Sequence, residues 1–193
     1  MDDVLATVGV LRRRFTVEEY YRMAEVGILT ERDRVELIQG EIIQMSPIGL
    51  RHAQCVAELN SRLVRGVGER ALMWPQNPVR LFPDTEPQPD LALIPRAWSR
   101  HAVAHPGPAD VLLLIEVADT SYRYDRNVKL PLYARAAVPE VWIIDLVNDV
   151  VEVFLHPRPQ GYAVTTRVER GGTVAPSAFP DVVLAVGDFI PPP

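Results

Sequence analysis

The fold of this chain is decided by the stretch Val111-Leu112-Leu113-Leu114-Ile115-Glu116-Val117-Ala118. Its apolar residues are continuous rather than alternating, which is typical of a strand that is buried on both faces of a sheet. One carboxylate, Glu116, interrupts the run. Burying an ionised carboxylate is costly unless a cation or a hydrogen-bonding partner meets it. The stretch therefore predicts a central strand and requires a chemical reason for the acid within it.

A second predicted strand has an acid at its start. In Pro89-Asp90-Leu91-Ala92-Leu93-Ile94 the apolar run follows directly on Asp90. Two carboxylates at the ends of two such strands are suitable ligands for a divalent metal ion. Taken alone, Asp90 could begin a turn after Pro89, and Glu116 could reach solvent or pair with an arginine. The occurrence of both acids together favours the metal site.

The residues around these strands predict further helices and strands. A capping box at Thr16-Val17-Glu18-Glu19 predicts a short helix that ends near Gly27. Helical spacing of apolar residues predicts the longest helix between Leu50 and about Glu69. The other predicted elements are a hairpin at 35–45, strands at 72–74, 79–82, 141–145, 150–155, 162–168 and 182–184, and a helix at about 126–137. This order predicts a mixed α/β (α+β) fold, with a central mixed sheet flanked by helices and additional antiparallel strands.

Length and composition are those of an ordinary globular protein. The chain has 193 residues, of which 48% are hydrophobic and 23% charged, enough for one domain with a sizeable core. The net charge of −5 gives no support to nucleic-acid binding, although local patches matter more than the total. The single cysteine, Cys55, can form neither an internal disulfide nor a thiolate zinc site, which suits a reducing cytoplasm. We expect a cytoplasmic protein without a signal peptide or membrane span.

Other motifs are absent or have simple interpretations. The sequence contains no Gly-rich phosphate loop, no Gly-x-Ser-x-Gly elbow and no His-rich metal motif, so kinase, serine-hydrolase and zinc-protease functions have no support. His52 is interpreted as a polar residue near a helix start rather than as a ligand. Asp145 is interpreted as the acid that begins a turn before Asn148-Asp149.

Several ordered blocks carry a resemblance to a known family. The two acids resemble the PD-(D/E)xK nuclease signature, but the position of its lysine, two residues after the second acid, is Ala118 here. The wider match consists of Asp33–Glu41, His52, Gln88–Leu91, Glu116–Ser121, Tyr124–Ala134 and Val138–Asp145. On these blocks, the chain from about Phe15 to Ile190 is identified as a member of the Uma-two family. The resemblance implies a restriction-endonuclease-like fold and endonuclease activity.

The resemblance also implies a site formed by Glu36, Asp90, Glu116 and Lys129. Asp90 and Glu116 would bind Mg²⁺ directly, with Mn²⁺ able to substitute, and Glu36 would bind it directly or through water. In such families the lysine can move from the strand to the following helix, which makes Lys129 the candidate. Spacing alone is equally compatible with a surface pair between Lys129 and Asp125, and alternation alone would place Glu36 on a solvated strand face.

The combined prediction is a Mg²⁺-dependent endonuclease that hydrolyses phosphodiester bonds in nucleic acid, with DNA as the expected partner. A non-catalytic nucleic-acid-binding or assembly module of the same fold remains an alternative, because the net charge is acidic and the strand lysine is missing. A metal-dependent hydrolase of small phosphate esters is a further one. We also expect a flexible arm at 1–14, a single restriction-endonuclease-like domain at 15–193, and a homodimer.

Overall fold

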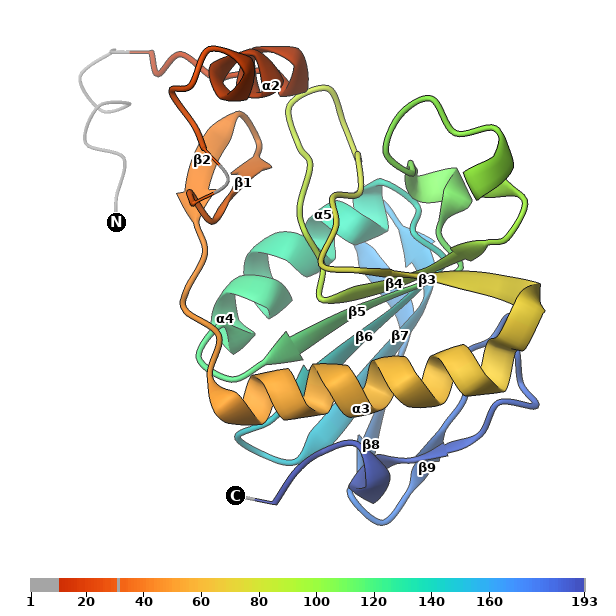
Figure 1. The fold of residues 1–193 in the computed structure, drawn as a ribbon. Coiled ribbons are helices and arrows are strands. Elements are labelled where there is room, and N and C mark those ends of the chain that lie inside the picture. Colours follow the sequence, from red (N-terminus) through yellow and green to blue (C-terminus); the bar gives the residue numbers. More distant parts are fainter. Residues whose placement is uncertain (1–10, 31, 193) are drawn as a thin grey trace. The chain divides into compact units, whose positions relative to one another are not determined.

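The computed structural model describes residues 11–30 and 32–192 (Figure 1). The described residues divide into two compact units: unit 1 runs to Met45 and also includes Phe82–Glu86, and unit 2 comprises Ser46–Leu81 and 87–192. Most of the predicted arm, residues 1–10, lies outside the described residues. The extent of a single domain at 15–193 stays a prediction.

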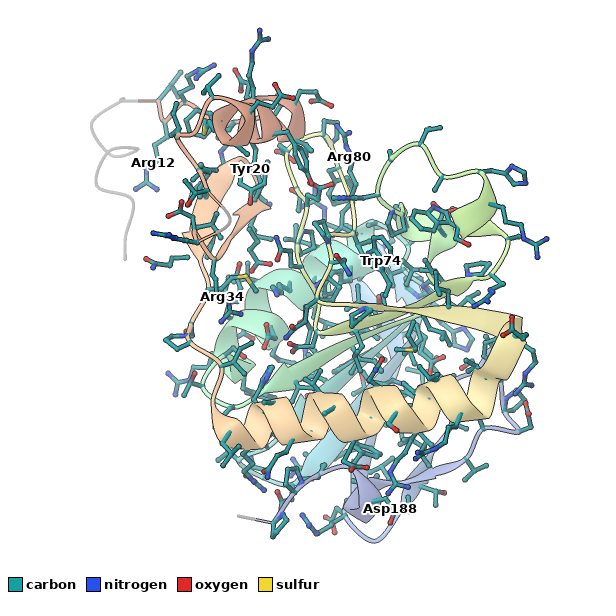
Figure 2. All side chains as sticks on the ribbon, viewed as in Figure 1. Arg12, Tyr20, Arg34, Trp74, Arg80 and Asp188 are labelled. Atoms are coloured by element: carbon teal, nitrogen blue, oxygen red, sulfur yellow. The ribbon has the colours of Figure 1, made fainter. Side chains whose placement is uncertain are left out.

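Unit 1 contains helix α2 (Val17–Glu25) and the antiparallel hairpin of β1 (Val35–Ile38) and β2 (Glu41–Gln44). The predicted capping box is confirmed, because the Glu19 N–H donates to the Thr16 hydroxyl at 3.2 Å and the Thr16 N–H donates to the Glu19 carboxylate at 3.0 Å. Tyr20 extends from α2, and its hydroxyl donates to the Val35 carbonyl at 3.0 Å (Figure 2). This hydrogen bond joins α2 to the first strand of the hairpin.

Unit 2 is built on a six-stranded mixed sheet with the order β3-β4-β5-β6-β7-β8. Its strands are β3 (Ala71–Pro75), β4 (Leu91–Pro95), β5 (Leu113–Ala118), β6 (Glu140–Asp145), β7 (Val150–Arg158) and β8 (Gly161–Glu169). Strands β5 and β6 are parallel, and all other neighbours in this sheet are antiparallel. A separate short pair joins β9 (Thr173–Val174) to β10 (Leu184–Ala185). The predicted fold class is confirmed.

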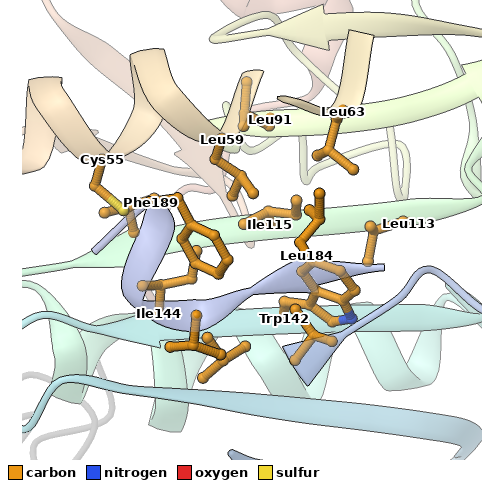
Figure 3. Packing of buried hydrophobic residues seen from close by; sticks show 14 of the residues in the cluster. Cys55, Leu59, Leu63, Leu91, Leu113, Ile115, Trp142, Ile144, Leu184 and Phe189 are labelled. Carbon is orange, nitrogen blue, oxygen red and sulfur yellow. The ribbon is translucent and has the colours of Figure 1, made fainter. Parts of the chain in front are cut away.

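Helices cover both faces of this sheet (Figure 1). The long helix α3 (Leu50–Val67) lies on one face, and the other is covered by a continuous helical segment of α4 (Tyr122–Tyr124), the π-helical turn η4 (Asp125–Lys129) and α5 (Leu130–Arg135). The core between α3 and the sheet is apolar and buried, and includes Cys55, Leu59, Leu63, Leu91, Leu113, Ile115, Trp142, Ile144, Leu184 and Phe189 (Figure 3). Burying a side chain of this kind contributes about 1.5–3 kcal/mol, so this core holds the strands that carry the site.

Three predicted elements differ from the structure. The strand expected at 182–184 forms only at Leu184–Ala185. The strand expected at 79–82 does not form. Prolines flank the segment and cannot donate to a ladder, so its Val79 and Arg80 N–H groups instead donate to the carbonyls of Pro87 and Pro106. The helix expected from about 126 begins earlier, at Tyr122, and contains a π-helical turn. The polar composition of 119–125 is typical of a loop, although Asp125 within it is buried.

None of the helices in the described part of the chain combines the length and the apolar character that a bilayer span needs.

Candidate metal and nuclease site

The pairing of β4 with β5 brings the two predicted acids to the same end of the sheet. Leu91 is opposite Ile115 in this antiparallel pair. Continuing the same register by one residue places Asp90 opposite Glu116. The Asp90 Oδ2 atom accepts a hydrogen bond from the Val117 N–H at 2.8 Å. One acid is thus bonded directly to the backbone of the strand that carries the other.

Glu116 lies in a buried polar cluster. Its neighbours Ile115 and Val117 belong to the core under α3, and because side chains alternate along a strand, Glu116 points to the opposite face. There the Tyr133 hydroxyl donates to its Oε1 atom at 2.5 Å, and the Lys129 Nζ atom lies 3.2 Å from the same oxygen. Burial raises the pKa of Glu116 well above its usual value, although the charge of Lys129 opposes this effect.

The π-helical turn brings Lys129 to this position. Both Lys129 and Asp125 are buried, with 4% and 3% of their surface exposed, and the Lys129 Nζ atom lies 3.9 Å from the Asp125 Oδ1 atom. Asp125 also accepts a hydrogen bond from the Ser121 hydroxyl at 2.6 Å. The alternative of a surface ion pair is therefore wrong in its location, because Lys129 contacts Asp125 and Glu116 together inside the protein. Single π-helical turns within α-helices frequently occur at functional sites.

Asp90 has a second partner that the sequence did not identify. The Nε2 atom of His52, in the first turn of α3, lies 3.1 Å from the Asp90 Oδ2 atom. Burial by itself lowers the pKa of His52, but the hydrogen bond to Asp90 and the nearby carboxylates of Asp119 and Asp125 outweigh it and raise the pKa overall. His52 is thus part of the polar cluster, not only a polar residue near a helix start.

Two other acids, Glu36 and Asp145, are interpreted from the sequence as a solvated strand residue or metal ligand and as a turn residue, respectively. Glu36 is buried on β1 in unit 1, with 2% of its surface exposed, so the solvated-face alternative is wrong. There its charge, after burial itself and the charge of Glu86, helps to raise the pKa of Tyr20. Asp145 accepts hydrogen bonds from the backbone N–H groups of the two residues Val147 and Asn148, which confirms its role in a turn.

The oxygen donors of this cluster limit the kind of metal ion that it could bind. No group of three or more His, Cys, Asp or Glu side chains within residues 11–30 and 32–192 is arranged to hold a metal. Mg²⁺, however, is commonly bound by one or two carboxylates together with water and substrate phosphate, rather than by a complete protein cage. Asp90 and Glu116 supply two hard oxygen ligands of this type, so the residues fit Mg²⁺. The participation of Glu36, which belongs to the other unit, stays a prediction.

Comparison with known proteins agrees with this fold. Residues 17–187 match the Uma2 family, described as "Putative restriction endonuclease", and the chain belongs to this family. A solved structure of the same fold is that of "a putative nuclease belonging to DUF820 from Anabaena variabilis ATCC 29413". It superimposes with a TM-score of 0.72 at 20% identity, covering 91% of this chain and 97% of that one. No curated protein matches the chain.

Proposed function

We propose that this protein is a Mg²⁺-dependent endonuclease that hydrolyses phosphodiester bonds in nucleic acid, with DNA as the first substrate to test and Mn²⁺ able to replace Mg²⁺. The observation that supports this most is the buried contact of 3.2 Å between Lys129 and Glu116, beside an aspartate bonded to the same strand. A buried ion pair contributes little net stability compared with apolar residues of the same volume. Stability alone therefore does not explain these charges, whereas chemistry on a phosphate does.

Each residue has a definite role in this proposal. Asp90 and Glu116 would hold the ion, and Glu36 would add a third oxygen directly or through water. When bound, the ion would stabilise charge on the phosphate and lower the pKa of a bound water. Lys129 would orient the attacking water or meet the negative charge that develops on the phosphate.

The family assignment supports nucleic acid as the partner. We also infer a cytoplasmic homodimer, because two copies of the site would be needed to address the two strands of a duplex, and because the chain has a single cysteine. Size-exclusion chromatography over a range of concentrations tests the dimer, and elution at 21.6 kDa throughout would count against it.

Cleavage assays with matched variants test the activity. Purified protein is offered single- and double-stranded DNA and RNA with Mg²⁺, Mn²⁺ or a chelator, and the variants are Asp90→Asn and Glu116→Gln. Glu58→Gln is the control, because Glu58 is an exposed acid of α3. Cleavage that needs the metal and both site acids, but not Glu58, is the expected result.

Two other results would point to the alternatives. Metal-independent binding of nucleic acid without cleavage would favour a non-catalytic module. Cleavage of a chromogenic phosphodiester, with polymers left intact, would favour a hydrolase of small esters. A calorimetric titration of Mn²⁺ into wild type and Asp90→Ala separates the metal step from both, since equal and negligible heats would contradict metal binding by Asp90.

A further inference from the structure

The protein holds the two site acids in the same manner, through one oxygen of each. The Oε1 atom of Glu116 accepts hydrogen bonds from both the Tyr133 hydroxyl and the Lys129 ammonium. The Oδ2 atom of Asp90 accepts a hydrogen bond from the Val117 N–H and is also bonded to the Nε2 atom of His52. The described residues donate no hydrogen bond to the other two oxygens, Oε2 of Glu116 and Oδ1 of Asp90.

From this arrangement we propose that His52 and Tyr133 are positioning residues, which turn the Oδ1 atom of Asp90 and the Oε2 atom of Glu116 toward a shared divalent cation. This inference rests on the proposed function, because it assigns the two residues a role relative to the metal of that function. Donors in the outer shell of a metal site commonly orient the carboxylates that bind the ion.

Tyr133 is suited to this role by its rigidity. The terminal torsion of a glutamate is broad and nearly two-fold, so a carboxylate without fixed donors can exchange its two oxygens. The Tyr133 side chain is completely buried on α5, and its hydroxyl lies 2.5 Å from Oε1, the distance of a charge-assisted hydrogen bond. Lys129 is a flexible point charge by comparison. Tyr133 therefore determines which oxygen of Glu116 faces the divalent cation.

His52 is suited to the same role by the way it uses its two nitrogens. To donate to an ionised Asp90, a neutral His52 must carry its proton on Nε2, which makes Nδ1 an acceptor. The Nδ1 atom is buried and has no hydrogen-bond partner among the described residues. The ring thus satisfies Asp90 while leaving its own second nitrogen unsatisfied. This is expected of a residue whose orientation serves its neighbour rather than its own solvation.

Metal affinity, measured by calorimetric titration of Mn²⁺ alone, tests the proposal without reference to activity. The variants are His52→Ala and Tyr133→Phe, and His52→Gln is the conservative variant, because the glutamine amide nitrogen can replace Nε2 as donor to Asp90. Tyr162→Phe is the control, since it also removes a tyrosine hydroxyl, which is part-buried and donates to the Val138 carbonyl at 2.8 Å in the same unit.

We expect Mn²⁺ affinity to fall by roughly 10–100-fold in His52→Ala and Tyr133→Phe, as is typical for outer-shell residues, and to stay near the wild-type value in His52→Gln and Tyr162→Phe. Wild-type affinity in both His52→Ala and Tyr133→Phe would overturn the inference and leave the proposed function standing. An equal loss in Tyr133→Phe and Tyr162→Phe would also overturn it for Tyr133, because a general loss of packing would then suffice. Wild-type protein that binds no Mn²⁺ would instead overturn the metal step of the proposed function, and the inference with it.

A measurement on the wild-type protein covers the case of a variant that does not fold. Nitrogen NMR of the four imidazole rings is followed while Mg²⁺ is added. The His52 signals should shift on saturation, while those of His101, an exposed residue, should not. Unchanged His52 signals in protein that has bound Mg²⁺ would contradict the proposed role of His52.

Discussion

Replacing Lys129 with methionine should destabilise the protein strongly, and more so at higher pH. The change removes the cation beside Glu116, and both side chains are almost completely buried. Removing one partner of a buried ion pair typically costs about 3–5 kcal/mol, because the other charge is left uncompensated. An exposed pair would lose only about 0–1 kcal/mol. The structure therefore predicts that Lys129→Met lowers the free energy of unfolding at pH 8 by about 3–5 kcal/mol, the value of a buried pair.

The loss should shrink as the pH falls, because the pKa of Glu116 is already raised by burial. An acid whose pKa is higher in the folded state binds its proton more tightly there than in the unfolded chain. Its contribution to stability is complete below the usual carboxyl pKa of 4.5 and is lost as the pH rises through the folded value. Without Lys129 the pKa of Glu116 rises further. The variant should then lose up to about 1.4 kcal/mol per pH unit relative to the unfolded chain in this range.

Urea unfolding of four proteins between pH 5 and pH 8 measures the effect. They are the wild type, Lys129→Met, Glu116→Gln and the double variant. The double variant should be more stable than Lys129→Met at pH 8, since it carries no uncompensated charge, and its stability should depend less on pH. A loss below about 1 kcal/mol in Lys129→Met, or one that is the same at every pH, would refute the description of this pair as buried and coupled.

Three further predictions concern single residues of the sheet and of the helices that cover it. Burial raises the pKa of Glu140, so its contribution to stability is lost as the pH rises above the usual value of 4.5; Glu140→Gln should flatten this decline in urea titrations, and a profile parallel to the wild type would contradict it. A β-carbon on Gly66 would collide with the side chain of Val182, so Gly66→Ala should lower stability by about 1–3 kcal/mol, measured as a fall in melting temperature. Deleting Asn127 should convert the π-helical turn to an α-helical one and rotate the following residues, so metal-dependent cleavage should be lost while circular dichroism keeps the helical signal; retained cleavage would show that the turn does not position Lys129.

The sequence was most informative where a local pattern carries the structure. The continuous apolar run around Glu116 predicted a central strand, and the capping box at Thr16 predicted the start of α2. It was least informative at 122–125, because the polar residues there have the composition of a loop although Asp125 is buried, and because the π-helical turn that follows breaks the 3.6-residue spacing.

The partners of the two acids could not be derived from spacing. His52 and Asp90 are 38 residues apart, and Tyr133 and Glu116 are 17 apart, so only the folded sheet brings each pair together. A signal for them was nevertheless present. His52 and Tyr133 both lie in the blocks that carry the family resemblance, although neither belongs to the motif that defines the acids. Polar residues within such blocks are therefore worth testing as supports of the motif.

The burial of the one cysteine has a practical consequence. Cys55 faces the apolar core, and burial raises its pKa to about 12, so its thiol remains protonated and unreactive toward alkylating reagents at neutral pH. A cysteine introduced at an exposed position such as Glu58 would then be the one attachment point for a fluorophore or spin label. A single substitution is thus enough for spectroscopic labelling, and the native cysteine need not be removed first.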